Sequence, residues 1–345
     1  MIKFNKAYLA ISNDAKEQAK QISNIRNTWI ANQKRLGAMA GGDSMAINQG
    51  IATEDFFRKT DKAIVAARTQ AKYKFVEDLA GLATPVPVGA LSYASLASGD
   101  ISDTISRSMD MQGLKTFDSI TAGSDKNPIP AFTGGVGMNY RYRMGLQEES
   151  IDLMTQGITR KTIKIMENIG DYFLNGDSNI VADGVAGQGI KNHRNTRLIT
   201  LANSLVTGTS DQIITFFQQT FKAILNEEVV DKVKVWVSPE IMINLMKPLS
   251  AAGEYKEGTL LDQVKRFCPH IESIDEDFAL NGDEFIAYMR DKQVISPLIA
   301  LPITSYQAMR IDPYENFNTN IIAVQGLKIA STYNGKKGVF YAHKA

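Results

Sequence analysis

The feature that most constrains the fold is a long amphipathic pattern between residues 146 and 175. Apolar side chains recur there at steps of three, four or seven, which places them on one stripe of a helix. A helix over this range would be about 45 Å long, and Asn175-Gly176 suits its left-handed end. The pattern therefore predicts a spine helix, with a stripe formed by Ile151, Met154, Ile158, Ile165, Ile169 and Tyr172.

The segment before this helix has little apolar content. Residues 90–145 are rich in Gly, Ser, Thr and Asp, yet they hold two strand-like pieces, near Met111–Ile120 and at Met138–Met144. The run Gly123–Pro128 between them has the composition of a turn. We expect a long two-stranded excursion, which needs a neighbour to lie on because an isolated hairpin is marginal in water.

The N-terminal part has the pattern of an arm. Residues 14–36 are mostly polar, and Ile22, Ile25, Trp29 and Leu36 form one narrow apolar stripe. Such a stripe cannot anchor an independent domain, so the pattern favours an arm that docks onto something else. The proline-rich run 84–89 then predicts extended backbone.

The rest of the chain alternates between helices and strands. Ser210 or Thr209 is expected to cap a helix that reaches Leu225, and Ser238-Pro239 is a typical helix start. No repeat of fixed period is present, so the order predicts a mixed α and β module inserted before terminal strands. Strands are expected at 233–237, 271–274, 284–290, 305–311, 321–333 and 338–343, and a further helix at 260–267.

Composition narrows the classes of function. Lys and Arg total 38 and Asp and Glu total 37, a net charge of +1, which argues against wrapping DNA by bulk electrostatics. The first ten residues are too polar for a signal peptide, and no run approaches a membrane span. We therefore expect no membrane partner, and a protein made and kept in a cytoplasm until something releases it. The single cysteine, Cys268, cannot form an internal disulfide.

No residue pattern predicts catalysis, a cofactor or a metal. His193, His270 and His343 lack metal-ligand spacing. The glycine runs 134–137 and 184–189 lack the strand and helix context of a phosphate loop, and flexible turns are the favoured interpretation. The pair Cys268 and His270 is interrupted by a proline, which disfavours a reactive geometry. We expect a protein that is not an enzyme.

One short strip is a candidate contact surface. Tyr140, Arg141, Tyr142 and Arg143 alternate aromatic and cationic side chains. Tyr and Arg are favoured at protein–protein interfaces, although such a strip could also contact nucleic acid. Together with Trp29 in the arm, these residues are the predicted inter-subunit contacts.

The order of these parts resembles the major capsid proteins of tailed bacteriophages with the Hong Kong 97-like fold. The motif Glu167–Asp177, with its Leu-Asn-Gly-Asp end, looks like the end of that family's spine helix. The strand Val233–Val237 running into Ser238-Pro239-Glu240 is similar to a strand and helix start in the family's axial domain. The resemblance covers nearly the whole chain in order.

The resemblance implies an α+β fold with four regions. Residues 1–85 would be an N-terminal arm, and residues 86–145 an extended loop over an adjacent subunit. Residues 146–205 and 301–345 would form a peripheral domain with the spine helix, and residues 206–300 an axial domain around the capsomer centre.

The same resemblance implies partners and a location. Subunits would form the hexamers and pentamers of an icosahedral shell in a virion, after synthesis in a bacterial host. Scaffold, portal and decoration proteins are possible partners, and packaged double-stranded DNA would contact the inner face weakly and without specificity. Two alternatives stay open: an encapsulin-like compartment shell that holds cargo enzyme, and a soluble α/β enzyme that uses the glycine-rich loops.

Overall fold

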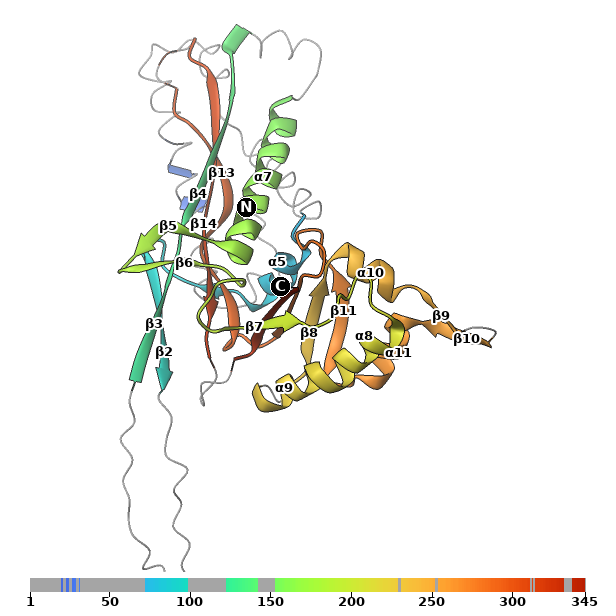
Figure 1. Ribbon diagram of the computed structural model, residues 1–345. Coiled ribbons are helices and arrows are strands. Elements are labelled where there is room, and N and C mark those ends of the chain that lie inside the picture. The colour runs from blue at the N-terminus through green and yellow to red at the C-terminus, as the bar shows by residue number, and fades with distance from the viewer. Residues whose placement is uncertain are drawn as a thin grey trace, which may run out of the picture. The chain divides into compact units, whose positions relative to one another are not determined.

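A computed structural model describes most of the chain from residue 72 onward (Figure 1). The chain divides into two compact units, which we describe separately. The first unit comprises residues 1–91, 129–174 and 297–327, and the second comprises residues 92–128, 175–296 and 328–345. The described residues are 72–98, 122–141, 153–228, 231–251, 254–310, 312, 314–331, 337–344 and six separate positions between 20 and 31.

The first unit is built on helix α7 (Leu153–Asn175), the expected spine (Figure 1). Its apolar stripe is buried as expected at Met154, Ile158, Ile165, Ile169 and Tyr172. The helix ends where the sequence predicts, because Gly176 takes the left-handed conformation with φ +71°. The range 146–152 of the predicted helix, with Ile151, lies outside the described residues.

A four-stranded sheet completes the first unit, in the order β1-β13-β14-β4. Strand β4 packs on α7, because the Phe132 and Tyr172 rings lie edge to face with centroids 6.0 Å apart. A short helical segment, α5 with η1, precedes β1. The extended backbone expected at 84–89 is confirmed at Thr84 and Pro85, whereas Val88 and Gly89 form a turn in which the Ala90 N–H donates to the Pro87 carbonyl. The bounds are α5 (Lys74–Leu79), η1 (Ala80–Leu82), β1 (Thr84–Pro85), β4 (Ala131–Met138), β13 (Ile295–Gln307) and β14 (Phe317–Ile329).

The second unit contains a five-stranded mixed sheet in the order β11-β8-β12-β15-β7. Its core is aromatic: Phe217 and Phe221 pack against Phe285 and Phe340 of the sheet. The strands are β7 (Thr196–Leu201), β8 (Val233–Val237), β11 (Ile271–Glu276), β12 (Phe285–Met289) and β15 (Val339–Lys344). The helices are α8 (Ser210–Thr215), the π-helix η2 (Phe216–Phe221), α9 (Lys222–Glu228), α10 (Pro239–Leu245) and α11 (Leu260–Phe267).

The expected helix starts in this unit are confirmed. Thr209 closes a capping box with Gln212 at the start of α8. Ser238 accepts a hydrogen bond from the Ile241 backbone N–H, with Pro239 at the first helical position of α10. Both caps satisfy backbone donors that a helix start leaves without partners.

Three hairpins extend the second unit. Strands β2 and β3 pair from Ser92 with Pro128 to Ser98 with Ala122, and this ladder is the described part of the expected extended loop. The β5–β6 hairpin contacts β3 (Figure 1). The bounds are β2 (Ser92–Ser98), β3 (Ala122–Pro128), β5 (Gly176–Ala182), β6 (Val185–Gln188), β9 (Pro248–Ala251) and β10 (Glu254–Thr259).

Two expectations for the extended loop are wrong. Gly123–Pro128 is strand β3 and not a turn, because β2 pairs with it along its whole length. The strand expected at Met138–Met144 is not present over the described residues 139–141, since β4 ends at Met138, opposite the first residue of β14. Asn139 accepts a hydrogen bond from the Arg141 N–H, and residues 140 and 141 are helical. The strand expected at Met111–Ile120 lies outside the described residues.

The glycine runs are also more ordered than expected. Gly134–Gly137 lies in β4, because the strand must approach α7 closely. A Cβ on Gly134 would meet Lys161 Cε at 2.6 Å. In the second run only the tip is a turn, at Asp183 and Gly184 with φ of +51° and +78°, and residues 185–188 form β6.

The strand expected at 305–311 starts ten residues earlier, since β13 begins at Ile295. Pro297 and Pro302 obscured it in the sequence, because proline lacks the N–H that a central strand needs. The neighbouring strand β1 pairs only with Leu298 and Ile299, so most of that side of β13 makes no ladder with β1 and tolerates proline.

Candidate inter-subunit contact site

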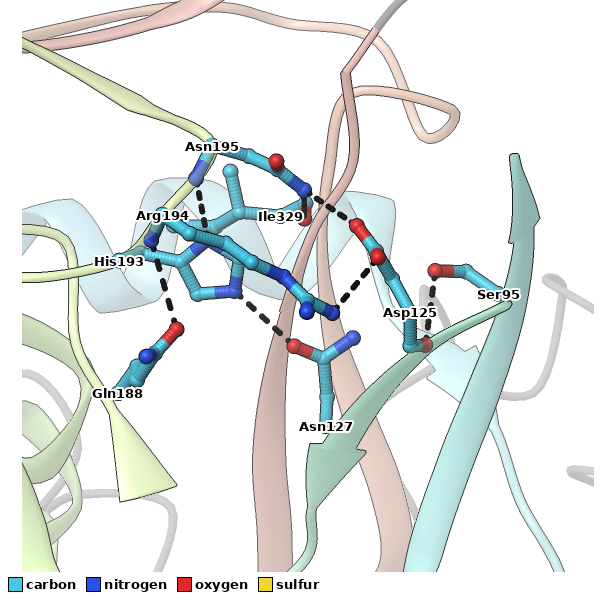
Figure 2. Close-up of polar contacts among 8 residues, drawn as sticks. All are labelled: Ser95, Asp125, Asn127, Gln188, His193, Arg194, Asn195 and Ile329. Atoms are coloured by element: carbon cyan, nitrogen blue, oxygen red, sulfur yellow. Dashed lines mark hydrogen bonds and ion pairs between the residues drawn. The ribbon is translucent and has the colours of Figure 1, made fainter. Parts of the chain in front are cut away.

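A group of polar side chains fixes the base of the β2–β3 hairpin (Figure 2). We call Asp125, Asn127, His193, Arg194 and Asn195 the hairpin-base cluster. Asp125 on β3 accepts from Asn195 Nδ2 at 2.7 Å through Oδ2, and its Oδ1 lies 2.7 Å from Arg194 Nη2. Both partners come from the loop between β6 and β7. The base of the β2–β3 hairpin is therefore fixed to the second unit.

Asn195 and His193 extend the cluster into the unit. Asn195 Nδ2 also donates to the Ile329 carbonyl at 2.9 Å, and the Asn195 N–H donates to His193 Nδ1 at 3.1 Å. Because Nδ1 accepts, the ring proton lies on Nε2, which is 3.0 Å from Asn127 Oδ1. These bonds require a neutral His193.

The electrostatics agree with a neutral ring. His193 is buried, and burial, reinforced by the nearby cations Arg194 and Lys337, lowers its pKa to about 4. The Asp125 carboxylate opposes this effect without overcoming it. Burial is therefore the main cause that keeps the His193 ring neutral.

The β5–β6 turn makes a second contact with the hairpin. Ser92 Oγ donates to Asp183 Oδ2 at 2.5 Å, and Lys126 Nζ lies 3.6 Å from the same oxygen. The Ser92 hydrogen bond, followed by the Lys126 charge, lowers the pKa of the Asp183 carboxyl. Both strands of the β2–β3 hairpin are thus held at their base.

The sequence-predicted contact residues are partly described. Tyr140 stacks on Phe317 with ring centroids 6.2 Å apart and lies edge to face with Tyr314. Arg310 lies over the Tyr140 ring at 5.7 Å. Arg141 is exposed. Tyr142, Arg143 and Trp29 lie outside the described residues, so the contact role of the strip and of Trp29 stays a prediction.

Sequence reasoning missed the hairpin-base cluster, because the run containing Asp125 and Asn127 has the composition of a turn. A usable signal was present: His193-Arg194-Asn195 is a polar run directly before an apolar strand. Only the fold brings this run to Asp125, which is 70 residues away in the chain.

The Cys268 and His270 pair does not form a reactive site. Cys268 is the C-cap residue of α11, where its backbone N–H donates to the Val264 carbonyl. Its thiol is buried, and burial raises the pKa of the thiol to about 11. A protonated thiol is a poor nucleophile. In the part of the chain that the structure describes, no three His, Cys, Asp or Glu side chains gather as a metal site would require. No helix among the described residues is long and apolar enough to cross a membrane.

Comparisons with known proteins show which family the sequence matches and which solved structures share its fold. The profile of a family of unknown function, DUF6260, matches residues 45–342. No curated protein sequence matches the chain significantly.

Several solved structures share the fold. A virus-like particle from Pyrococcus furiosus has a TM-score of 0.57 at 11% identity, covering 84% of this chain and 100% of that chain. The capsid of Myoviridae phage XM1 has a TM-score of 0.57 at 13% identity, and the match covers 79% of this chain and 92% of that chain. The capsid of a native GTA particle has a TM-score of 0.54 at 11% identity, and the match covers 77% of this chain and 89% of that chain. The expected α+β fold of Hong Kong 97-like capsid proteins is confirmed.

Proposed function

The chain belongs to the family of unknown function DUF6260, and we propose that it is a major capsid protein. It assembles with copies of itself into the icosahedral head shell that encloses the double-stranded DNA of a tailed phage. Its location is then the virion. Its work is structural, and no catalytic step is assigned to it.

The observation that carries this proposal is the fold itself. The likeness to capsid subunits spans most of this chain and about nine tenths or more of each compared chain. A soluble α/β enzyme gives no reason for such a complete likeness to shell subunits.

The hairpin explains how the fold would serve a shell. The β2–β3 ladder is two strands wide, and a two-stranded ribbon has too little core to be stable alone. Its base is fixed by the hairpin-base cluster, so its far end can gain stability by lying on a neighbouring subunit. Modest contacts repeated over many interfaces then hold a closed shell.

Exposed apolar side chains support subunit contacts in the same way. Leu91 is 77% exposed, Ile243 67% and Tyr314 76%. Apolar side chains of this size are favoured where a partner covers them. The arm, extended loop, peripheral and axial regions expected from the sequence remain our assignment of roles to these parts, as do the contacts with scaffold, portal, decoration proteins and DNA.

Assembly of the purified protein tests the proposal. We expect size-exclusion chromatography to give a particle peak and negative-stain electron microscopy to show closed shells. A compact monomer at high concentration would contradict a shell function. DNA content separates the two kinds of shell: particles isolated with the phage head genes should protect DNA from nuclease, whereas a compartment shell should instead retain a cargo enzyme.

A further inference from the structure

The five-stranded sheet of the second unit has β7 at one edge and β11 at the other. Each strand is six residues long. In the described part of the chain, no other strand pairs with the outer side of either one. Open edges in natural proteins are usually protected or used for binding. The ladder pattern also makes β7 and β11 run in the same direction.

The β7 edge is basic. A hollow of about 520 Å³ at the start of this strand is lined by four cationic side chains. Two of them, Lys191 and Arg194, form ion pairs with Glu284 and Asp125 of the same chain. Leu198 on the same edge is 57% exposed. The four cations are Lys191, Arg194, Arg197 and Lys337.

The β11 edge is acidic. It carries Glu272, Asp275 and Glu276, which are exposed or half-buried. Ile271 and Ile274, on either side of a register shift in this strand, are buried. Two cations lie nearby: Arg290 Nη1 is 3.7 Å from Glu272 Oε1, and Lys234 Nζ is 3.5 Å from Asp275 Oδ2. The exposed aromatic ring of Phe278 follows the strand.

The register places the two charged edges at the same level of the sheet. Arg197 pairs with Phe340, Phe340 with Ala287, Ala287 with Val235, and Val235 with Ile274. The next row across the sheet joins Leu198 to Asp275 in the same way. An edge-to-edge contact that continues these rows from one copy to the next therefore brings the basic edge of one subunit to the acidic edge of its neighbour.

We propose that the β7 edge, with Arg197 and Lys337, binds the β11 edge, with Glu272 and Asp275, of a second copy of this chain. This contact joins subunits head to tail, and such heterologous contacts close into rings when the rotation between copies closes. Opposite charges then set the orientation and the register, since like edges repel. The inference rests on the proposed shell function and names the surface that forms its rings.

Charge reversal tests the pairing. The variant R197E/K337E should lose rings and particles, and E272K/D275K should lose them as well. Combining all four substitutions restores opposite charges and should recover at least half of the wild-type particle yield by sedimentation and electron microscopy. R197E/K337E leaves the ion pairs of Lys191 and Arg194 within the subunit intact. E272K/D275K also removes the contacts with Arg290 and Lys234, so its circular dichroism is compared with that of the wild type. A matched control, R160E/K164E on α7, reverses two exposed cations elsewhere and should keep the yield within about twofold.

A cross-link gives a readout that does not depend on the charges. A variant that carries both Leu198→Cys and Phe278→Cys should give a ladder of covalently linked subunits on a denaturing gel after treatment with a short bismaleimide. Neither single-cysteine variant should give this ladder. Two results would overturn the pairing and leave the shell function standing. One is a wild-type particle yield from R197E/K337E. The other is no recovery of particles in the quadruple variant while its circular dichroism is native. If the wild-type protein forms no particles, the result counts against the shell function instead. Cross-linking of the Leu198→Cys/Phe278→Cys variant as concentrated subunits then still tests the pairing.

Discussion

Arg194 Nη2 lies 2.7 Å from Asp125 Oδ1, which ties the loop before β7 to strand β3 across 69 residues of sequence. Asn195 binds the other oxygen of the same carboxylate. One aspartate thus connects the extended hairpin to the sheet module. In a shell subunit, this connection determines where the hairpin points before any neighbour is present.

Asp125→Asn should weaken this connection. The amide loses the ion pair with Arg194 and offers Asn195 a weaker acceptor. We expect the free energy of unfolding to fall by about 1–2 kcal/mol. The loss is modest because the Arg194 side chain is 44% exposed and solvent screens the ion pair. Urea denaturation of unassembled subunits measures it. Asp231→Asn, at an exposed position, is the matched control, and an equal loss there would argue against a special role for Asp125.

His193 predicts an acid-sensitive fold. Its pKa is lowered in the folded state to about 4 from an ordinary 6.5, so the folded state binds fewer protons than the unfolded chain between these values. Stability from the neutral ring is full above about pH 6.5 and is lost as the pH falls toward 4, by about 3 kcal/mol at most.

The measurement is the urea midpoint at pH 7.5 and at pH 5.0. His193→Gln removes the titration and should flatten this dependence. Some dependence should remain, because burial lowers the pKa of His270 in the same direction. An unchanged pH slope in His193→Gln would contradict the assignment.

Gly170→Ala should destabilise the first unit despite the higher helix propensity of alanine. A Cβ at Gly170 would overlap the Tyr73 side chain, and overpacking of this kind costs about 1–3 kcal/mol. Thermal unfolding followed by circular dichroism measures the loss. Gly81→Ala, where an added Cβ meets nothing within 4 Å, should be nearly neutral. The penalty should shrink in a Tyr73→Ala background.

Replacing residues 99–121 with a short Gly-Ser turn should separate folding from assembly. Strands β2 and β3 and the hairpin-base cluster are retained, so the subunit should unfold with a near-native midpoint. Shells should be lost, because the replaced segment supplies the far end of the extended loop. Intact particles in electron micrographs would refute the role that we give the hairpin.

Cys268 should react only after unfolding. Its thiol is buried and its pKa is raised to about 11, so little thiolate exists at pH 8. Native protein should show almost no colour change with Ellman's reagent within minutes, and protein in urea should react with one equivalent. Rapid reaction of the native protein would show that α11 opens readily.

The sequence by itself determined the elements whose residues carry a strong local pattern. The stripe of α7, the Ser238-Pro239 start of α10 and the apolar strand at 233–237 are each specified by spacing or capping within a few residues. The order of these parts was enough to suggest the fold class, because each region of that fold has its own local character.

Only the tertiary structure decided the parts that depend on distant partners. Gly123–Pro128 has no local reason to be a strand, and it becomes one because β2 pairs with it and Asn195 binds Asp125. Likewise, nothing local places Leu198 level with Asp275 across five strands. Local patterns report the preferences of neighbouring residues, whereas sheet pairing and buried polar contacts join residues far apart in the chain, and these contacts exist only after folding.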